Sequence, residues 1–155
     1  MLIARLIVHG LLAVTLLGAI THQLVALLWG AGKTAQPASF VSHYRAARQQ
    51  LFTRAIVALY IATLVLGATL YPTYRVDVRI PFEEMSLGWA VGSFELKEHL
   101  AGLGLGSLPL YAHIWRPQFN DGHRRDRTMV SAFLALVVWF DFLVGHVLNN
   151  IRGLG

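Results

Sequence analysis

Histidine is the residue type whose positions in this sequence point to chemistry. Five of the seven histidines lie inside long apolar stretches: His9, His22, His99, His113 and His146. An ionisable side chain in such a stretch is costly to bury in a membrane, so it usually faces the bundle interior and has a partner there. Imidazole is also a common ligand of haem iron and other metals. The other two histidines, His43 and His123, fall in charged loops and are interpreted as solvated.

The spacing of these histidines suggests two levels of ligands. His9 and His22 are 13 residues apart, and His99 and His113 are 14 apart. On an α-helix, either separation is about 20 Å along the axis, so each helix offers one imidazole toward each side of a membrane. Two imidazoles at one depth are what a six-coordinate haem iron requires. Fourteen residues return to nearly the same helix face, whereas thirteen place His9 and His22 roughly 140° apart, which makes His146 the substitute outer ligand.

The composition leaves histidine as the candidate ligand. Cysteine is absent, which excludes disulfides, iron–sulfur clusters, thiolate zinc sites and covalently attached haem. A haem also needs small residues beside it, because the flat macrocycle must approach a helix backbone. Gly102 and Gly106 lie between the two histidines of the third stretch and are candidates for that role. Alternatively, small residues four apart simply let helices pack closely.

Four apolar stretches predict the fold. With 55% hydrophobic and only 14% charged residues, the chain has too little charge to cover the surface of a soluble domain. The stretches 6–29, 55–71, 94–115 and 129–148 lie near the ~20 residues that cross a hydrocarbon core. We therefore predict an all-α integral membrane four-helix bundle that forms one domain over residues 1–155. The first stretch exceeds the ~7–15 apolar residues of a signal peptide and is expected to be retained.

The basic residues predict the topology. The net charge is +5, and eight of the 13 Lys and Arg residues fall in the two loops that follow the first and third stretches: Lys33, Arg45, Arg48, Arg54, Arg116, Arg124, Arg125 and Arg127. The positive-inside rule assigns these loops to the cytoplasm and both termini to the outer side of the cytoplasmic membrane. This distribution explains the basic charge without a nucleic-acid partner. In the outward connection, residues 74–80 are expected to be extended and a short interfacial helix is expected to begin at Pro81.

Further charged residues lie near the histidines. Asp141 is in the middle of the fourth stretch, where it could orient a ligand imidazole, act as a proton group beside a quinone, or make one interhelical hydrogen bond. Lys97, Arg75 and Arg79 lie toward the outer side and could neutralise haem propionates. Alternatively, these three are solvated loop charges.

This pattern of histidines resembles the di-haem transmembrane b-type cytochromes. Shared features are two histidine pairs about fourteen residues apart on two helices of a four-helix bundle, with interleaved glycines. The family includes the haem-bearing core of respiratory quinol–cytochrome c reductases and smaller quinone-linked membrane cytochromes. The resemblance implies an outer haem between His9 and His99 and an inner haem between His22 and His113. Two haem b groups per chain are favoured over one.

The resulting prediction is an electron-transfer subunit of an oxidoreductase complex. It would pass electrons between quinone and a partner redox protein, within a larger complex or a homo-oligomer, and the haem would supply the redox chemistry. A second hypothesis is a non-redox assembly or structural subunit whose histidines form interhelical hydrogen bonds. A third is a conduit for protons or a metal ion, lined by histidine and aspartate.

The topology can be tested by cysteine labelling, since the chain has no cysteine of its own. A Gly122→Cys variant places the thiol in the second basic loop, which we predict to be cytoplasmic. An impermeant thiol reagent added from outside should leave it unlabelled. Labelling by that reagent in intact cells would contradict the predicted orientation.

Overall fold

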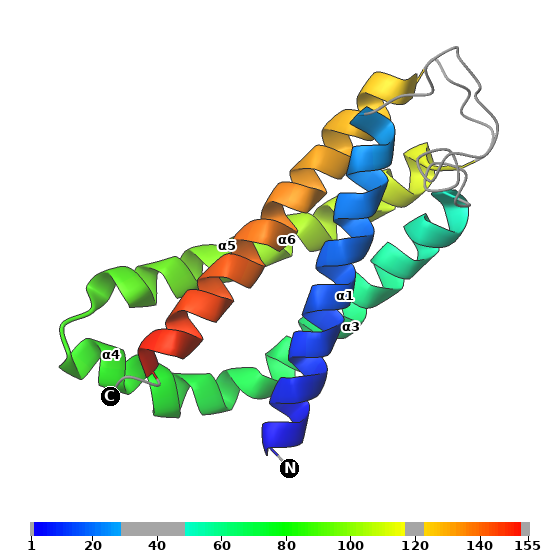
Figure 1. Ribbon diagram of the computed structural model, residues 1–155. Coiled ribbons are helices and arrows are strands. Elements are labelled where there is room, and N and C mark those ends of the chain that lie inside the picture. Colours follow the sequence, from blue (N-terminus) through cyan, green and yellow to red (C-terminus); the bar gives the residue numbers. More distant parts are fainter. Residues whose placement is uncertain (1, 29–48, 117–122, 153–155) are drawn as a thin grey trace.

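The computed structural model describes residues 2–28, 49–116 and 123–152, and every regular element in these ranges is a helix. The long helices, of 26 to 29 residues each, are α1 (Leu2–Leu28), α3 (Gln49–Tyr74), α5 (Gly88–Ile114) and α6 (Arg124–Arg152). A π-helical turn, η1 (Arg75–Arg79), and a short helix, α4 (Ile80–Glu84), continue α3. Successive long helices run in opposite directions, so α1 begins and α6 ends at the end of the bundle that holds α4 (Figure 1).

Three helical segments have the length and apolar composition needed to cross a membrane: Leu2–Leu28, Leu51–Glu84 and Arg124–Ile151. The protein is therefore all-helical over its described residues, with three candidate membrane spans. The fourth predicted span, 94–115, is not confirmed. Helix α5 has 27 residues, but Glu95, Lys97 and Glu98 fall within it and lower its hydropathy. Of these three residues, Glu95 and Glu98 are exposed, and only Lys97 turns toward a neighbouring helix.

The expectation that residues 74–80 are extended is wrong. The sequence alternates apolar and polar residues there, but the side chains pair at helical spacing instead. Arg79 Nε lies 2.7 Å from Glu83 Oε1, four residues further on, and Val78 and Phe82 are buried together in one apolar cluster. Residues four apart share a helix face, so the segment continues α3 as a helix. The short helix predicted after it is present as α4.

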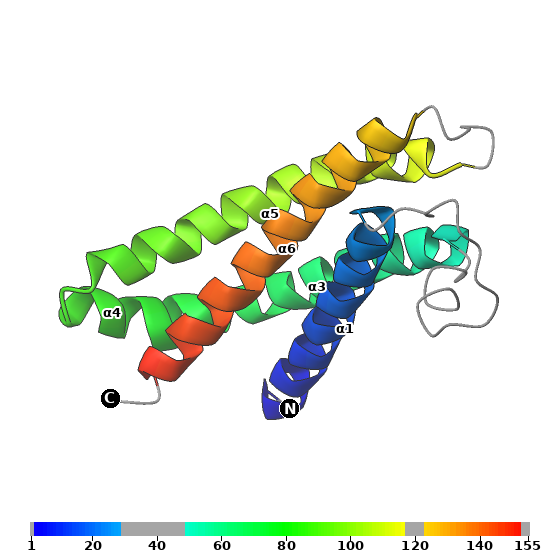
Figure 2. The same ribbon diagram turned by 45° about the horizontal axis from the view of Figure 1, so that its top comes forward.

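The helices form two packed pairs, because α1 packs along α3 and α6 packs along α5, with α1 also against α6. In Figures 1 and 2, α1 and α6 lie across the layer formed by α3 and α5. A larger apolar cluster fills the bundle toward the end opposite α4, with fully buried side chains from all four long helices: Ile20, Ile56, Tyr111 and Leu134. A smaller one joins η1, α4, α5 and α6: Val78, Phe82, Ala90 and Leu148.

A buried hydrogen-bond junction ties three helices together inside the larger cluster. The amide nitrogen of Gln23 on α1 donates to Thr53 Oγ1 on α3 at 3.1 Å, and its amide oxygen accepts from the Tyr111 hydroxyl on α5. Helix α6 joins α1 through Trp139 Nε1, which donates to Thr21 Oγ1 at 3.0 Å. Side-chain hydrogen bonds between apolar helices fix their register, since few other polar groups compete.

Arginines at the start of α6 satisfy the carbonyl ends of two other helices. Arg124 Nη2 donates to the Leu27 carbonyl at 2.7 Å, and Arg127 Nε donates to the Ile114 carbonyl at 2.9 Å. The last carbonyls of a helix have no partner in their own helix and attract positive charge. These arginines therefore cap α1 and α5, beyond their predicted role in orientation. Three other basic residues of the predicted cytoplasmic loops lie outside the described residues: Lys33, Arg45 and Arg48.

We predict that Tyr111→Phe lowers the free energy of unfolding by about 1–2 kcal/mol, because it leaves the buried Gln23 amide oxygen without its donor. Tyr74→Phe is the matched control, since the Tyr74 hydroxyl is buried without a hydrogen-bond partner among the described residues. Removing that hydroxyl should be neutral or stabilising. Thermal unfolding of the detergent-solubilised variants measures both, and equal losses in the two variants would contradict the role of the junction.

Candidate functional site

The two histidines of α1 face α3. A Cβ atom built on Gly67 of α3 would lie 3.2 Å from His9 Cε1, so the imidazole would have to shift by a few tenths of an ångström to admit a side chain there. The His22 ring stacks on Phe52, with ring centroids 4.7 Å apart and planes 17° apart. Both histidines are half-buried. Their imidazoles therefore occupy the contact between α1 and α3.

The other three helical histidines lie on the outside of the bundle. His99 and His113 on α5 and His146 on α6 are all exposed, contrary to the expectation that all five face the interior. The His146 ring lies nearly parallel to that of Phe142, with centroids 6.3 Å apart. His99 and His113 do share one face of α5, as their spacing predicts, but that face points away from the other helices.

Other residues of α5 occupy its inner side. Lys97 and Tyr111 point into the bundle, and each precedes a histidine by two residues. Two residues correspond to a rotation of about 200° around a helix, which carries His99 and His113 to the opposite side. The implied pairs of His9 with His99 and of His22 with His113 are therefore not brought together within this chain.

The glycines of α5 also differ in whether they face the bundle or point away from it. A Cβ atom on Gly102 or Gly106 would meet nothing within 4 Å, whereas one on Gly104 would overlap the hydroxyl of Tyr60. The Tyr60 hydroxyl fits into that space and donates to the Ala101 carbonyl at 2.9 Å. Gly102 and Gly106 thus leave an open surface between the two exposed histidines. We call the surface formed by His99, Gly102, Gly106 and His113 the outer face of α5.

His99 is held in an orientation suited to ligation. Its Nδ1 lies 2.6 Å from the backbone carbonyl oxygen of Glu95, one turn earlier in α5. A carbonyl oxygen only accepts, so Nδ1 carries the hydrogen, and in the neutral imidazole Nε2 then has the lone pair. A histidine whose Nδ1–H is fixed by a carbonyl presents Nε2 in the manner of a metal ligand.

The interior at the inner histidine level does not fit a haem. Gln23 and Tyr111 meet between α1 and α5 there, and the side chain of Ile20 beside them is fully buried. Packed side chains therefore fill the space that a macrocycle between His22 and His113 would need. Among the described residues, no three His, Asp or Glu side chains gather as a metal site. The outer face of α5 instead carries one exposed imidazole at each of two levels, with open space at Gly102 and Gly106 between them.

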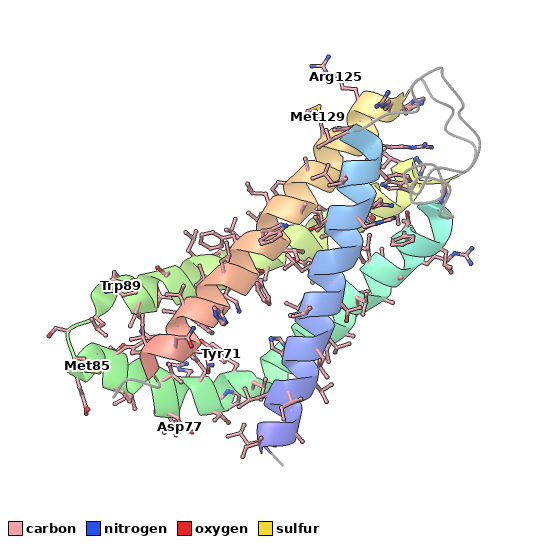
Figure 3. All side chains as sticks on the ribbon, in the orientation of Figure 1. Tyr71, Asp77, Met85, Trp89, Arg125 and Met129 are labelled. Carbon is pink, nitrogen blue, oxygen red and sulfur yellow. The ribbon has the colours of Figure 1, made fainter. Side chains whose placement is uncertain are left out.

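The cations predicted to neutralise propionates have different surroundings. Arg79 Nε and Nη2 lie 2.7 Å from Glu83 Oε1 and 3.6 Å from Glu95 Oε1. The Arg75 guanidinium is exposed and lies 6.0 Å above the ring of Tyr71, which Figure 3 labels near the α4 end. Arg75 is thus the better placed of the two to meet an anion from outside.

Lys97 and Asp141 belong to the bundle interior. Lys97 Cε would lie 3.7 Å from a Cβ atom on Gly145 of α6, so the lysine stem crosses that glycine. Its ammonium lies 5.2 Å from the centroid of the Phe94 ring, three residues earlier in α5. Neither residue lies on the outer face of α5, so neither orients His99 or His113.

Three polar side chains of the interior were missed, two of them because their partners lie on other helices. Gln23 makes the interhelical junction, Tyr60 fills the space over Gly104, and Thr63 has a buried hydroxyl with no hydrogen-bond partner among the described residues. Each is a polar side chain inside an apolar stretch, which is the same signal that singled out the histidines.

Comparisons with protein-family models, with curated proteins and with solved structures found no match to this chain. The function must therefore be argued from the side chains and their surroundings.

Two alanine substitutions distinguish the inner side of α5 from its outer face. Gly104→Ala should destabilise the protein by about 1–3 kcal/mol, because its methyl group displaces the Tyr60 hydroxyl from Ala101. Gly106→Ala should be neutral or stabilising by up to about 1 kcal/mol, because its Cβ enters open space and alanine favours helix. Thermal unfolding in detergent measures both. A larger loss for Gly106→Ala would show that the opposite side of α5 faces the bundle.

Proposed function

We propose that this protein is a membrane b-type cytochrome subunit that transfers electrons between quinone and a partner redox protein, with haem bound at the outer face of α5. The observation that carries the proposal is the hydrogen bond and the exposure of the His99 imidazole. Its Nδ1–H is fixed by the Glu95 carbonyl at 2.6 Å, and its ring lies on the exposed side of the helix. Nε2 is then the atom available to an axial position.

The spacing along α5 supports two haems. His99 and His113 are 14 residues apart on this face, which corresponds to about 21 Å along the helix axis. Each would be one axial ligand of a separate iron. The second ligand of each comes from a partner, either another redox subunit or a second copy of this chain, because His9 and His22 face α3. His146, exposed on α6, is the further candidate for the outer level.

The chain contributes ligation, clearance and charge. When bound, haem supplies the one-electron chemistry. The Glu95 carbonyl keeps His99 in one tautomer, and Gly102 and Gly106 let a flat ring approach the α5 backbone. Arg75 is the cation assigned to the propionates, since Arg79 is engaged by two carboxylates. With both termini on the outer side of the cytoplasmic membrane, the His99 level is the outer one.

An absorption spectrum with haem quantification tests this proposal on the chain purified from membranes. We expect a sharp Soret band and split α and β bands on reduction. The haem content should be two per chain where another subunit supplies the second ligands, and two per dimer where a second copy supplies them. His99→Ala should lose one haem or convert it to high spin, and His113→Ala should do the same at the inner level. His123→Ala, an exposed histidine before α6, is the matched control and should keep both haems.

Two results would overturn the proposal. Full haem content with a low-spin spectrum in both α5 variants would remove these histidines as ligands. A chain that purifies folded with no haem, both alone and with the subunits that copurify with it, would instead favour the non-redox hypotheses.

A further inference from the structure

Exposed residues of α5 repeat every seven positions and form a stripe along the helix. One set is leucine, with exposed fractions between 50% and 61%: Leu96, Leu103 and Leu110. The other set alternates glycine and histidine, and all four members are exposed: Gly92, His99, Gly106 and His113. Members of the two sets alternate at spacings of four and three residues, which is the pattern by which one helix packs along another. We call these seven residues the heptad stripe.

The heptad stripe faces away from the other three long helices. The opposite side of α5 is buried in the bundle, where Tyr111 meets Gln23 and Tyr60 fills the space over Gly104. On the stripe, by contrast, a Cβ atom built on Gly92 or Gly106 would meet nothing within 4 Å. The interior packing of the chain therefore leaves this regular helix-packing surface exposed.

The proposed function sets the requirements for whatever covers the stripe. A partner must present one imidazole at the level of His99 and another at the level of His113, about 21 Å away along the helix. The heptad stripe of a second copy carries both imidazoles at that spacing. Copies of one chain insert into a membrane with the same orientation, so two α5 helices would run parallel. Each stripe residue then lies at the depth of its counterpart.

The charges on and beside the stripe allow two copies to meet. No Asp, Glu, Lys or Arg belongs to the heptad stripe, so two identical stripes bring no like charges together. Glu95, beside its outer end, has the Nη2 atom of Arg79 in its own chain 3.6 Å from Oε1. The stripe is therefore compatible with its own copy, as an interface around a two-fold axis must be.

We propose that the heptad stripe of α5 binds the heptad stripe of a second copy of this chain, in a parallel dimer around a two-fold axis. The inference rests on the proposed function and names the partner that supplies the second axial ligands. His99 of the two copies holds the outer haem, and His113 of the two copies holds the inner one. The chain then needs no other subunit to complete its haem sites.

The size of the stripe indicates how the dimer is held together. Three heptads of helix are about 32 Å long and about 10 Å wide. Such a strip has an area of roughly 300 Å² per copy, which is less than half of the ~800 Å² per partner in a standard interface. Direct packing of the stripes is therefore a small part of the stability, and the dimer should depend on the shared axial ligands.

The first test measures the particle mass by light scattering, together with the haem content, for the chain purified from membranes in detergent. We expect two copies and two haems in each particle. The double variant His99→Ala/His113→Ala should be a monomer without haem. His123→Ala, an exposed histidine before α6, is the matched control and should remain a dimer with two haems.

The outcomes separate this inference from the haem proposal. A particle that binds haem but contains one copy, alone or with another subunit, would overturn the inference and leave the haem proposal standing. A haem-free dimer joined through the heptad stripe would do the reverse. A folded monomer without haem would overturn both.

The second test locates the interface in membranes, in a chain that has no native cysteine. Leu103→Cys places a thiol on the heptad stripe. Leu105→Cys, at an exposed leucine one-half turn further along α5, places one off the stripe at nearly the same depth and is the matched control. A flexible bis-maleimide linker should give at least about fivefold more covalent dimer from position 103 than from position 105. Equal yields, a higher yield from position 105, or no dimer from position 103 would contradict the interface.

Discussion

Polar groups in an apolar bundle must find their partners on neighbouring helices, and the Gln23 amide does this for three helices at once. Its two ends bind Thr53 and Tyr111, so α1, α3 and α5 have one relative register in which both bonds form. The larger apolar cluster packs around that junction, with Ile20 and Ile56 fully buried beside it. Apolar packing alone would allow these helices to shift along one another by one turn. The two hydrogen bonds of the Gln23 amide prevent such a shift.

This junction also determines which side of α5 is exposed. Once Tyr111 points inward to meet Gln23, helical geometry brings Gly104 and Lys97 to the same side, one and two heptads earlier. His99, Gly102, Gly106 and His113 must then point outward. The haem-binding surface that we propose is therefore a consequence of the interior packing, and a partner that completes it would cover small residues and imidazoles without disturbing the core.

The positions of helices such as α1 and α6 could be predicted from the sequence, because an apolar run of that length has few possible structures other than a helix. Two features did not follow. The alternation of Val76, Val78 and Ile80 with polar residues is equally typical of a strand. Only the apolar cluster around Phe82 favours the helix over the strand. The direction of the α5 histidines depended on Gly145 of α6, which gives the Lys97 stem a place to lie. No pattern within α5 carries that information, since a lysine and a histidine are both polar side chains that a membrane helix should turn inward.

The arginine caps at the start of α6 give the chain an order of assembly. Proteins are made from the N-terminus onward, so α1 and α5 are complete before Arg124 and Arg127 exist. Until then, the terminal carbonyls of α1 and α5 lack these charged donors. The arrival of α6 supplies both caps together with Trp139, its bond to α1. The last helix to be made therefore completes the hydrogen bonding at the ends of two helices made before it, and a chain shortened before α6 would lack all three of these bonds.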